Sequence, residues 1–264
     1  MKKIAKAIAA ITLAFSMAFA GAADNSIYID QMGDNTTVSV TQDGAGNTVR
    51  GIQGVGTGNT TPAKIYGDGN QVTVSQVGTG NTLNFGIVTT VAAGVTNGNQ
   101  YSYSITGNNS SATINSNVAG TGISASNRVA VNQTGNSSNT NINVLGTANQ
   151  ITATTAGGAN NSVVSTVDGD NNTQTVSMTG GGGNSTTITQ NGDKGTVSLT
   201  SVGGSNLFTV AQTGGGTNGH SATLDFNGSG NTATVTQQGT SADSIVNLKS
   251  VGSTNTFTIN TNTH

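Results

Sequence analysis

The chain has no cysteine, no tryptophan and no glutamate, and one proline among its 264 residues. Without cysteine, its stability cannot come from disulfide bonds. Lys and Arg together number 8 and acidic residues 10, and strong helix formers are scarce, whereas Val, Ile and Thr are frequent, which favours strands. A hydrophobic content of 33% with little net charge is also unlike simple disorder. This bias, together with 39 glycines, predicts a repeat fold rather than an ordinary globular core.

The N-terminus has the pattern of a secretory signal. Three lysines within the first six residues form a basic head, residues 4–19 are otherwise almost all apolar, and Ala-Phe-Ala follows at residues 18–20. A basic head, an apolar stretch and small residues at a cleavage site are typical of a signal peptide. We therefore expect residues 1–20 to be removed and residues 21–264 to form one repeat domain. A membrane anchor is the alternative, but the apolar run is short for a span, and we expect no integral membrane segment after cleavage.

Charge excludes one class of partner. Removal of residues 1–20 leaves five basic residues against ten aspartates, a formal charge of −5. Proteins that bind nucleic acids need clustered Lys and Arg to neutralise phosphates. We therefore expect no nucleic-acid partner.

One short stretch shows how the rest of the chain is built. Asn70, Val72, Val74 and Gln76 occupy alternate positions and are separated by small polar residues. In an extended strand such residues share one face. Gly78 then begins a glycine-rich segment suited to a tight turn. The stretch therefore predicts one half-buried strand followed by one turn.

This unit recurs along the chain. Asn followed by Gln six residues later occurs seven times, at Asn25–Gln31, Asn47–Gln53, Asn70–Gln76, Asn127–Gln133, Asn184–Gln190, Asn206–Gln212 and Asn231–Gln237. A glycine follows the glutamine by two residues at Gly33, Gly78, Gly135, Gly192, Gly214 and Gly239. Gln42 and Gly44 keep this order within a strand one residue longer, and Asn81 restarts the pattern after Gln76.

Other alternating stretches lie between these units and lack the glutamine, for example Leu83 to Ile87 and Val197 to Leu199. The true repeat is therefore a pair of strands, about 22–25 residues long. We predict an all-β fold, a β-solenoid of roughly ten layers with an amyloid-like cross-β core. Residues 86–98 and 115–126 are longer than turns require, and are expected to be protruding loops or strands of drifted sequence.

Inward-facing amides have a consequence for assembly. A buried amide is costly unless its donors and acceptors are matched. Stacked identical amides can satisfy one another as a ladder, and the ladder ends at the first and last layers, where strand edges are also open. No stretch at either terminus resembles a cap. The sequence therefore predicts end-to-end polymerisation.

The pattern Asn-x5-Gln-x-Gly-x-x-Asn resembles the curlin repeat of bacterial curli fibre subunits. Residues 42–47 and 76–81 match its Gln-x-Gly-x-x-Asn core fully, and the resemblance extends over nearly all of residues 21–264. It implies a secreted functional amyloid of the bacterial cell surface that polymerises with itself and contributes to adhesion and biofilm matrix. It also implies export through the periplasm and a dedicated outer-membrane pore, with a nucleator subunit as a further partner.

The sequence lacks the patterns of a metal site or a catalytic site. The Gly-Asp turns at residues 67–70 and 168–171 lack the repeat of calcium-binding β-rolls, and plain Asx turns are favoured. His220 and His264 belong to no metal-ligand pattern, and no Gly-x-Ser-x-Gly elbow is present. We therefore expect no enzyme and no cofactor. Tyr101, which shares its strand face with Tyr103, is more readily a core residue than part of a sugar platform.

One alternative function comes from a different class. A monomeric β-solenoid can serve as a surface adhesin or an ice-binding module through regular outward rows of threonine. Thr234, Thr236, Thr256 and Thr258 are candidates for such rows. Outward positions elsewhere are mixed, so this hypothesis ranks below the polymer subunit, and an enzyme on a β-helix ranks below both.

Overall fold

A computed structural model describes residues 10–15, 24–52, 61–89, 98–117, 124–215 and 217–263. The predicted signal, residues 1–20, therefore lies mostly outside the described part of the chain, as do Gln53 and His264. The described residues form strands and turns and no helix. None of them forms a helix long and apolar enough to cross a membrane.

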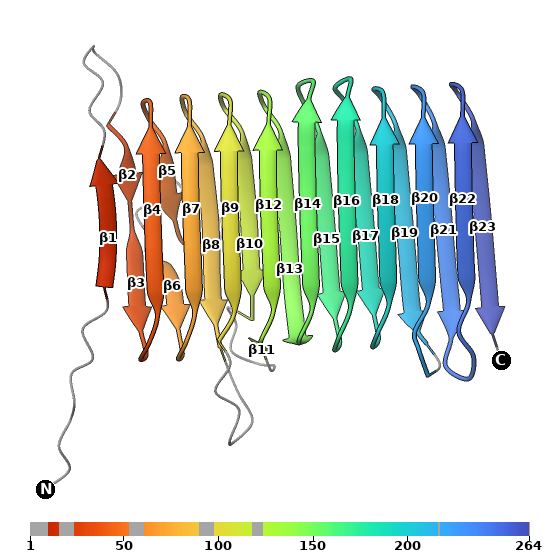
Figure 1. The fold of residues 1–264 in the computed structure, drawn as a ribbon, viewed down its shortest axis with the longest axis horizontal. Helices are drawn as coiled ribbons and strands as arrows, with labels where there is room; N and C mark the ends of the chain where they lie inside the picture. Colours follow the sequence, from red (N-terminus) through yellow and green to blue (C-terminus); the bar gives the residue numbers. More distant parts are fainter. Residues whose placement is uncertain are drawn as a thin grey trace, which may run out of the picture.

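The strands form two stacked parallel sheets, which we call sheet A and sheet B (Figure 1). Sheet A has ten strands in the order β1 (Ala10–Phe15), β4 (Thr37–Asp43), β7 (Gln71–Val77), β9 (Gln100–Thr106), β12 (Arg128–Thr134), β14 (Gln150–Gly157), β16 (Thr173–Gly180), β18 (Thr196–Val202), β20 (Ser221–Asn227) and β22 (Ile245–Val251).

Sheet B lies opposite and has ten levels. In order they are β2 (Ser26–Ile27) with β3 (Ile29–Met32), β5 (Thr48–Arg50) with β6 (Ala63–Tyr66), β8 (Thr82–Val88), β10 (Ser111–Ser116), β13 (Asn139–Thr147), β15 (Ser162–Asp168), β17 (Ser185–Asn191), β19 (Leu207–Gly214), β21 (Thr232–Gly239) and β23 (Thr256–Thr263). Strand β11 (Ser124–Ala125) pairs with β13 beside this path.

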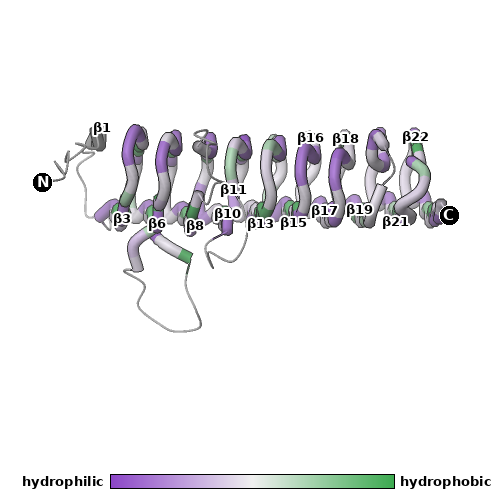
Figure 2. The backbone as a smooth tube through the Cα atoms, turned by 90° about the horizontal axis from the view of Figure 1, so that it is seen from below, coloured by the Kyte–Doolittle hydropathy of each residue, from purple (hydrophilic) through white to green (hydrophobic). Residues whose placement is uncertain are grey.

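The chain passes from one sheet to the other at each turn, so from β12 onwards each strand pairs with the strand two places further along. Figure 2 shows the two sheets as separate layers joined by these turns. The pairing is parallel and in register, as in Val72 beside Val38 and Tyr101. The predicted β-solenoid is therefore confirmed, with a pair of strands as its repeat.

The alternation of apolar and polar residues along each strand decides which side chains are buried between the two sheets. Within β7, Val72 and Val74 are 3% and 2% exposed, while Gln71 and Thr73, at the alternate positions, face solvent. The same period holds in the facing sheet, so a thin apolar core runs between the two layers. Phe208 and Phe226 meet across it with ring centroids 4.8 Å apart. Tyr101 and Tyr103 are buried in this core, as predicted.

The two long segments of the middle are partly strand. Residues 86–88 complete β8 and residues 115–116 complete β10. Residues 90–97 and 118–123 lie outside the described part of the chain. The long connections therefore sit between regular strands and do not interrupt the stacking of the sheets.

Candidate functional site

Two columns of buried polar residues, most of them asparagine, run along the solenoid, one at each row of turns. Each asparagine stands just before a strand. One column consists of the residues just before the strands of sheet B. In it, the Asn206 Oδ1 accepts from the backbone N–H of Asn231 at 2.8 Å. The Asn206 Nδ2 donates to the carbonyl of Gly228, one layer further on, at 2.9 Å. Asn206 is 1% exposed, so the column supplies buried hydrogen bonds between successive turns.

The same exchange is repeated from layer to layer. Members of the sheet B column are Asn25, Asn47, Asn81, Ser110, Ser138, Asn161, Asn184, Asn206, Asn231 and Asn255, and most successive pairs are joined by a backbone N–H to side-chain oxygen bond. The sheet A column contains Asn70, Asn99, Asn127, Asn149, Asn172, Gly195, His220 and Ser244. Most of these bonds link a side chain to a backbone N–H. Bonds of amide on amide, which the sequence suggested, also occur, for example from the Asn231 Nδ2 to Asn206 Oδ1 at 3.1 Å.

His220 takes the place of asparagine in the second column. It is 1% exposed, and its Nδ1 accepts from the Ser244 backbone N–H at 3.2 Å. Its Nε2 lies 3.2 Å from the Thr213 carbonyl oxygen. With Nδ1 as acceptor and Nε2 as donor, the imidazole ring performs the task of an asparagine.

Glutamine ladders are shorter than the sequence suggested. In sheet B, the Gln190 Nε2 donates to Gln212 Oε1 and the Gln212 Nε2 to Gln237 Oε1, both at 2.8 Å. The ladder ends where the Gln237 Nε2 donates to the Ser244 carbonyl at 2.9 Å. All three side chains are buried, so this is a three-rung amide ladder.

The glutamines of β4, β7 and β12 lie in the other sheet. Gln42 Nε2 donates to Gln76 Oε1 at 2.8 Å in sheet A. Gln133 is separated from Gln76 by Ile105, and its Nε2 donates instead to Thr140 Oγ1 at 3.0 Å. A single uninterrupted glutamine column is therefore not present, because the glutamine strands change sheet between Gln133 and Gln190.

The other sequence-predicted positions are Gln31 and the turn glycines. Gln31 is half-buried and donates to the Gly33 carbonyl at 2.7 Å. The seven predicted turn glycines have φ values from 79° to 140°: Gly33, Gly44, Gly78, Gly135, Gly192, Gly214 and Gly239. A left-handed backbone of this kind favours glycine.

Sequence reasoning missed several members of the columns. Asn99, Asn149, Asn161 and Asn172 are buried and take part like the others, but no glutamine follows them six residues later. A search for asparagine at the residue before each alternating stretch would have found them, since that position and not the glutamine spacing defines the column.

The Gly-Asp turns use their carboxylates as hydrogen-bond acceptors between layers. Asp68 Oδ1 accepts from the Asp34 backbone N–H and Asp170 Oδ1 from that of Thr147, each at 2.7 Å. No group of three potential metal ligands occurs among the described residues. These carboxylates therefore act as turn acceptors between adjacent layers.

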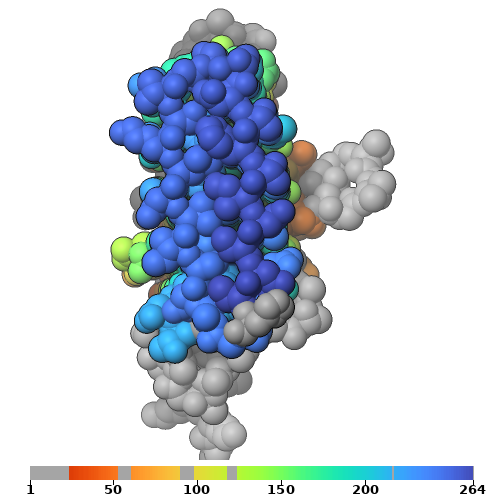
Figure 3. Space-filling model, turned by 90° about the vertical axis from the view of Figure 1, so that its right-hand side faces the viewer, coloured from red at the N-terminus to blue at the C-terminus, as the bar shows by residue number. Residues whose placement is uncertain are grey.

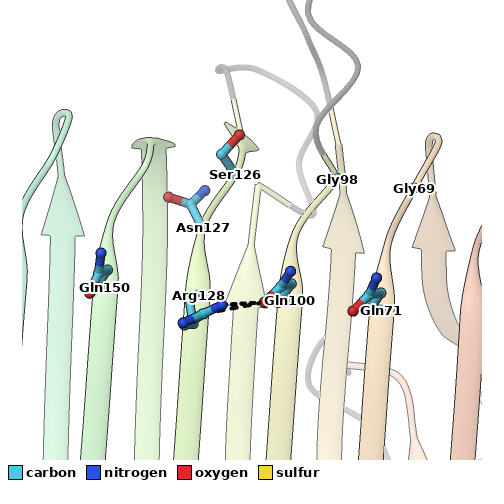
Figure 4. Close-up of a pocket in the computed structure, with 8 residues that line it drawn as sticks. All are labelled: Gly69, Gln71, Gly98, Gln100, Ser126, Asn127, Arg128 and Gln150. Carbon is cyan, nitrogen blue, oxygen red and sulfur yellow. Dashed lines mark hydrogen bonds between the residues drawn. The ribbon is translucent and has the colours of Figure 1, made fainter.

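A shallow hollow lies on the outer face of sheet A beside the starts of β9 and β12 (Figure 4). Its volume is about 510 Å³. Gln71, Gln100, Arg128 and Gln150 stand in register along its floor. The Arg128 Nη2 donates to Gln100 Oε1 at 2.9 Å. This row offers amide and guanidinium donors to a polar ligand, without a carboxylate among its lining residues.

The C-terminal end presents an unpaired strand of each sheet. Figure 3 looks onto this end, where β22 and β23 lie. No strand of the described chain pairs with the outer edge of β23. Leu248, Phe257 and Ile259 are only partly buried there, and Ile245 and Val251 are 72% and 73% exposed. The last level therefore leaves backbone groups and apolar side chains accessible.

The N-terminal end is similar in sheet B. Strands β2 and β3 pair on one side only, with β5 and β6. Ile27 and Ile29 are partly buried against the core. In sheet A the outer edge of β4 carries β1, which belongs to the predicted signal.

Outward threonines form one continuous row. Thr187, Thr209, Thr234 and Thr258 are in register on four successive levels of sheet B. The neighbouring row is broken, because Thr236 lies between Ala211 and Asn260. A regular two-dimensional Thr-x-Thr array is therefore present only in part.

Two comparisons with known proteins bear on the family. No protein-family model matches the chain, and no curated protein matches it. The fold and the columns described above consequently carry the functional argument by themselves.

Proposed function

We propose that the chain, after removal of residues 1–20, is a secreted structural subunit of curli-like extracellular amyloid fibres that grow by end-to-end stacking. The observation that supports this most is the repetition of the sheet B pattern up to both ends of the solenoid, each with an open edge. An open edge next to apolar side chains is a template for adding another chain.

The two ends are complementary in sheet B. Within the solenoid, the first N–H of a strand donates to the carbonyl of the column residue in the next level, as Thr232 does to Asn255 at 2.8 Å. Continuation of this pattern places Thr256 of one copy against Ser26 of the next. Asn255 Oδ1 then accepts from the Asn25 N–H, which repeats the bond that joins Asn231 and Asn255 at 3.0 Å.

The same register matches the inward side chains. Phe257 falls beside Ile27 and Ile259 beside Ile29, all four of them partly buried in the single chain. Covering them removes apolar surface from water, at about 25 cal/mol per Å². The asparagine column and the core would therefore both continue from copy to copy.

The test is polymerisation of the purified processed chain. We expect fibres that bind amyloid dyes and diffract at about 4.8 Å and 10 Å, the spacings of parallel stacked strands. Ile259→Asp should slow fibre growth strongly, because it places a charge in the junction. Asn260→Asp, on the solvent face of the same strand, is the matched control and should grow like the parent. A chain that stays monomeric at high concentration with added seeds would contradict the proposal.

The resemblance to curli subunits also supports an outer-membrane pore and a nucleator subunit as partners, with a role in adhesion and biofilm. We expect surface fibres when the full chain is produced in a bacterium that carries a curli-type pore, and retention inside the cell when that pore is deleted. Equal display in both strains would overturn the export route while leaving polymerisation in place.

One observation favours a second candidate, a monomeric adhesin or ice-binding module. The row Thr187, Thr209, Thr234 and Thr258 supplies hydroxyls at intervals of about 4.8 Å. Replacement of Thr209 and Thr234 with lysine should abolish ice-crystal shaping by the monomer if this function holds. The polymer proposal expects no ice shaping by the parent chain.

A further inference from the structure

The two sheets differ in their number of levels once the signal is set aside. Sheet B runs from β2–β3 to β23 and has ten levels. Sheet A has ten strands including β1, and hence nine from β4 to β22. Because the chain alternates between sheets, the first and the last of the described strands after residue 20 both belong to sheet B.

Because sheet B has one level more than sheet A, two processed copies cannot pair in both sheets at once. When β23 of one copy pairs with β2–β3 of the next, β22 and β4 are left two strand spacings apart, about 9–10 Å instead of about 4.8 Å. When β22 pairs directly with β4, β23 and β2–β3 compete for one level of sheet B. One of the sheets is therefore always mismatched at the junction.

We propose that each junction between processed copies contains a vacant strand position in sheet A, and that this position binds one extended segment of a second polypeptide. The inference rests on the proposed function, because it requires end-to-end stacking and removal of residues 1–20. A filled position would give β22 and β4 a backbone partner on both sides.

The neighbouring strands define the chemistry of the segment. On one side, β22 presents Val246 and Leu248 to the core, and on the other side β4 presents Val38 and Val40. The third inward pair is polar, Ser250 and Gln42. A fitting segment therefore has about seven residues, with aliphatic side chains at two alternate positions and a small polar or amide side chain at the next.

In the full chain, a parallel strand occupies the outer edge of β4. Strand β1 pairs with β4 over six positions, from Ala10 beside Thr37 to Phe15 beside Gln42. Figure 1 shows it at the N-terminal end of sheet A. Removal of residues 1–20 takes this strand away and leaves the edge of β4 open to another chain.

Engineered cysteine pairs test the vacancy, since the chain has no cysteine of its own. A disulfide requires Cα atoms within about 7 Å. In fibres of the processed chain, Ser26→Cys with Thr256→Cys should cross-link neighbouring copies through sheet B. Ser39→Cys with Asn247→Cys, the matched pair in sheet A, should not cross-link. Ready cross-linking of the sheet A pair would overturn the vacancy while leaving the polymer intact.

A synthetic peptide with the sequence of residues 36–43 tests the binding. Added to the processed chain, it should shorten the lag of fibre formation several-fold and co-sediment at one peptide per chain. The same peptide with aspartate at both valine positions should do neither. A peptide carrying cysteine in place of Ser39 should cross-link to Asn247→Cys of the fibre.

The outcomes separate the two proposals. If the processed chain forms no fibres with or without peptide or seeds, the proposed function itself fails. If it forms fibres that ignore the peptide, or that link only through the sheet A pair, the vacancy is overturned. Fibres that link through sheet B and take up the peptide support both.

Discussion

At the scale of single residues, the asparagine columns tie adjacent layers together more tightly than the glutamines do. Most of the asparagines accept from a backbone N–H of the next level and donate to a glycine carbonyl of that level, as Asn184 does toward Asn206 and Gly203. An unsatisfied buried polar group costs about 1–3 kcal/mol. Loss of one asparagine therefore leaves partners unpaired on both sides of a turn.

Replacement of Asn206 tests the contribution of the asparagine columns to stability. Asn206→Ala removes the acceptor of the Asn231 N–H and the donor to the Gly228 carbonyl, and we expect it to lower the free energy of unfolding by about 2–4 kcal/mol. Asn206→Ser should lose less, because serine already stands in this column at Ser110. Denaturant titration measures the effect. Asn227→Ala, at an exposed position of β20, is the control and should change stability by less than about 0.5 kcal/mol.

The buried tyrosines predict a dependence of stability on alkaline pH. Burial raises the pKa of both Tyr101 and Tyr103 far above the usual value, and for Tyr101 the nearby hydroxyls of Ser116 and Ser124 offset this only in part. In the unfolded chain the phenols ionise near pH 10. Their contribution to stability is therefore complete below pH 10 and is lost as pH rises above it.

We expect the free energy of unfolding to fall above pH 10 by up to about 1.4 kcal/mol per pH unit for each of these tyrosines. The variant Tyr101→Phe with Tyr103→Phe should show a shallower decline over the same range. Equilibrium unfolding at several pH values between 8 and 12 measures both slopes. Parallel slopes for parent and variant would show that these phenols are not the cause.

At the scale of strands and turns, the sequence predicted most of the architecture. The period of two in stretches such as Leu83 to Ile87 identified the inward face, and that face is buried. The assignment of strands to sheets could not be read from the glutamines. Four strands without the glutamine repeat, β13 to β16, separate Gln133 from Gln190, so the glutamines continue in sheet B.

The tight turns make a further prediction. Gly78 has φ of 113°, and a Cβ added to it would lie 2.0 Å from the carbonyl oxygen of Gly107 in the next level. Gly78→Ala should therefore force the turns of adjacent levels apart and lower the free energy of unfolding by about 1–3 kcal/mol. Thr79→Ala, at the exposed neighbouring position, should have little effect. Thermal unfolding of the two variants checks the difference, and equal melting temperatures would contradict the close approach.

At the scale of the whole molecule, each level contacts only the levels beside it. Stability in such an array is a sum of units and interfaces, and the terminal units have one interface each. Leu248, Phe257 and Ile259 at one end and Ile27 and Ile29 at the other are accordingly less buried than their counterparts inside. The ends of a single copy should therefore open more readily than its middle.

Amide hydrogen exchange of the processed chain connects this gradient to assembly. In the monomer we expect β2, β3, β4, β22 and β23 to exchange first and β14 to β18 last, because terminal strands lack one neighbour. In the fibre, β23 and β2–β3 should become protected, since they pair across the junction. Strands β22 and β4 should stay less protected until a peptide fills sheet A between them. Equal protection of both sheets in peptide-free fibres would mean that sheet A closes without an added strand, whereas exchange that is identical in monomer and fibre would mean that copies do not join through these ends.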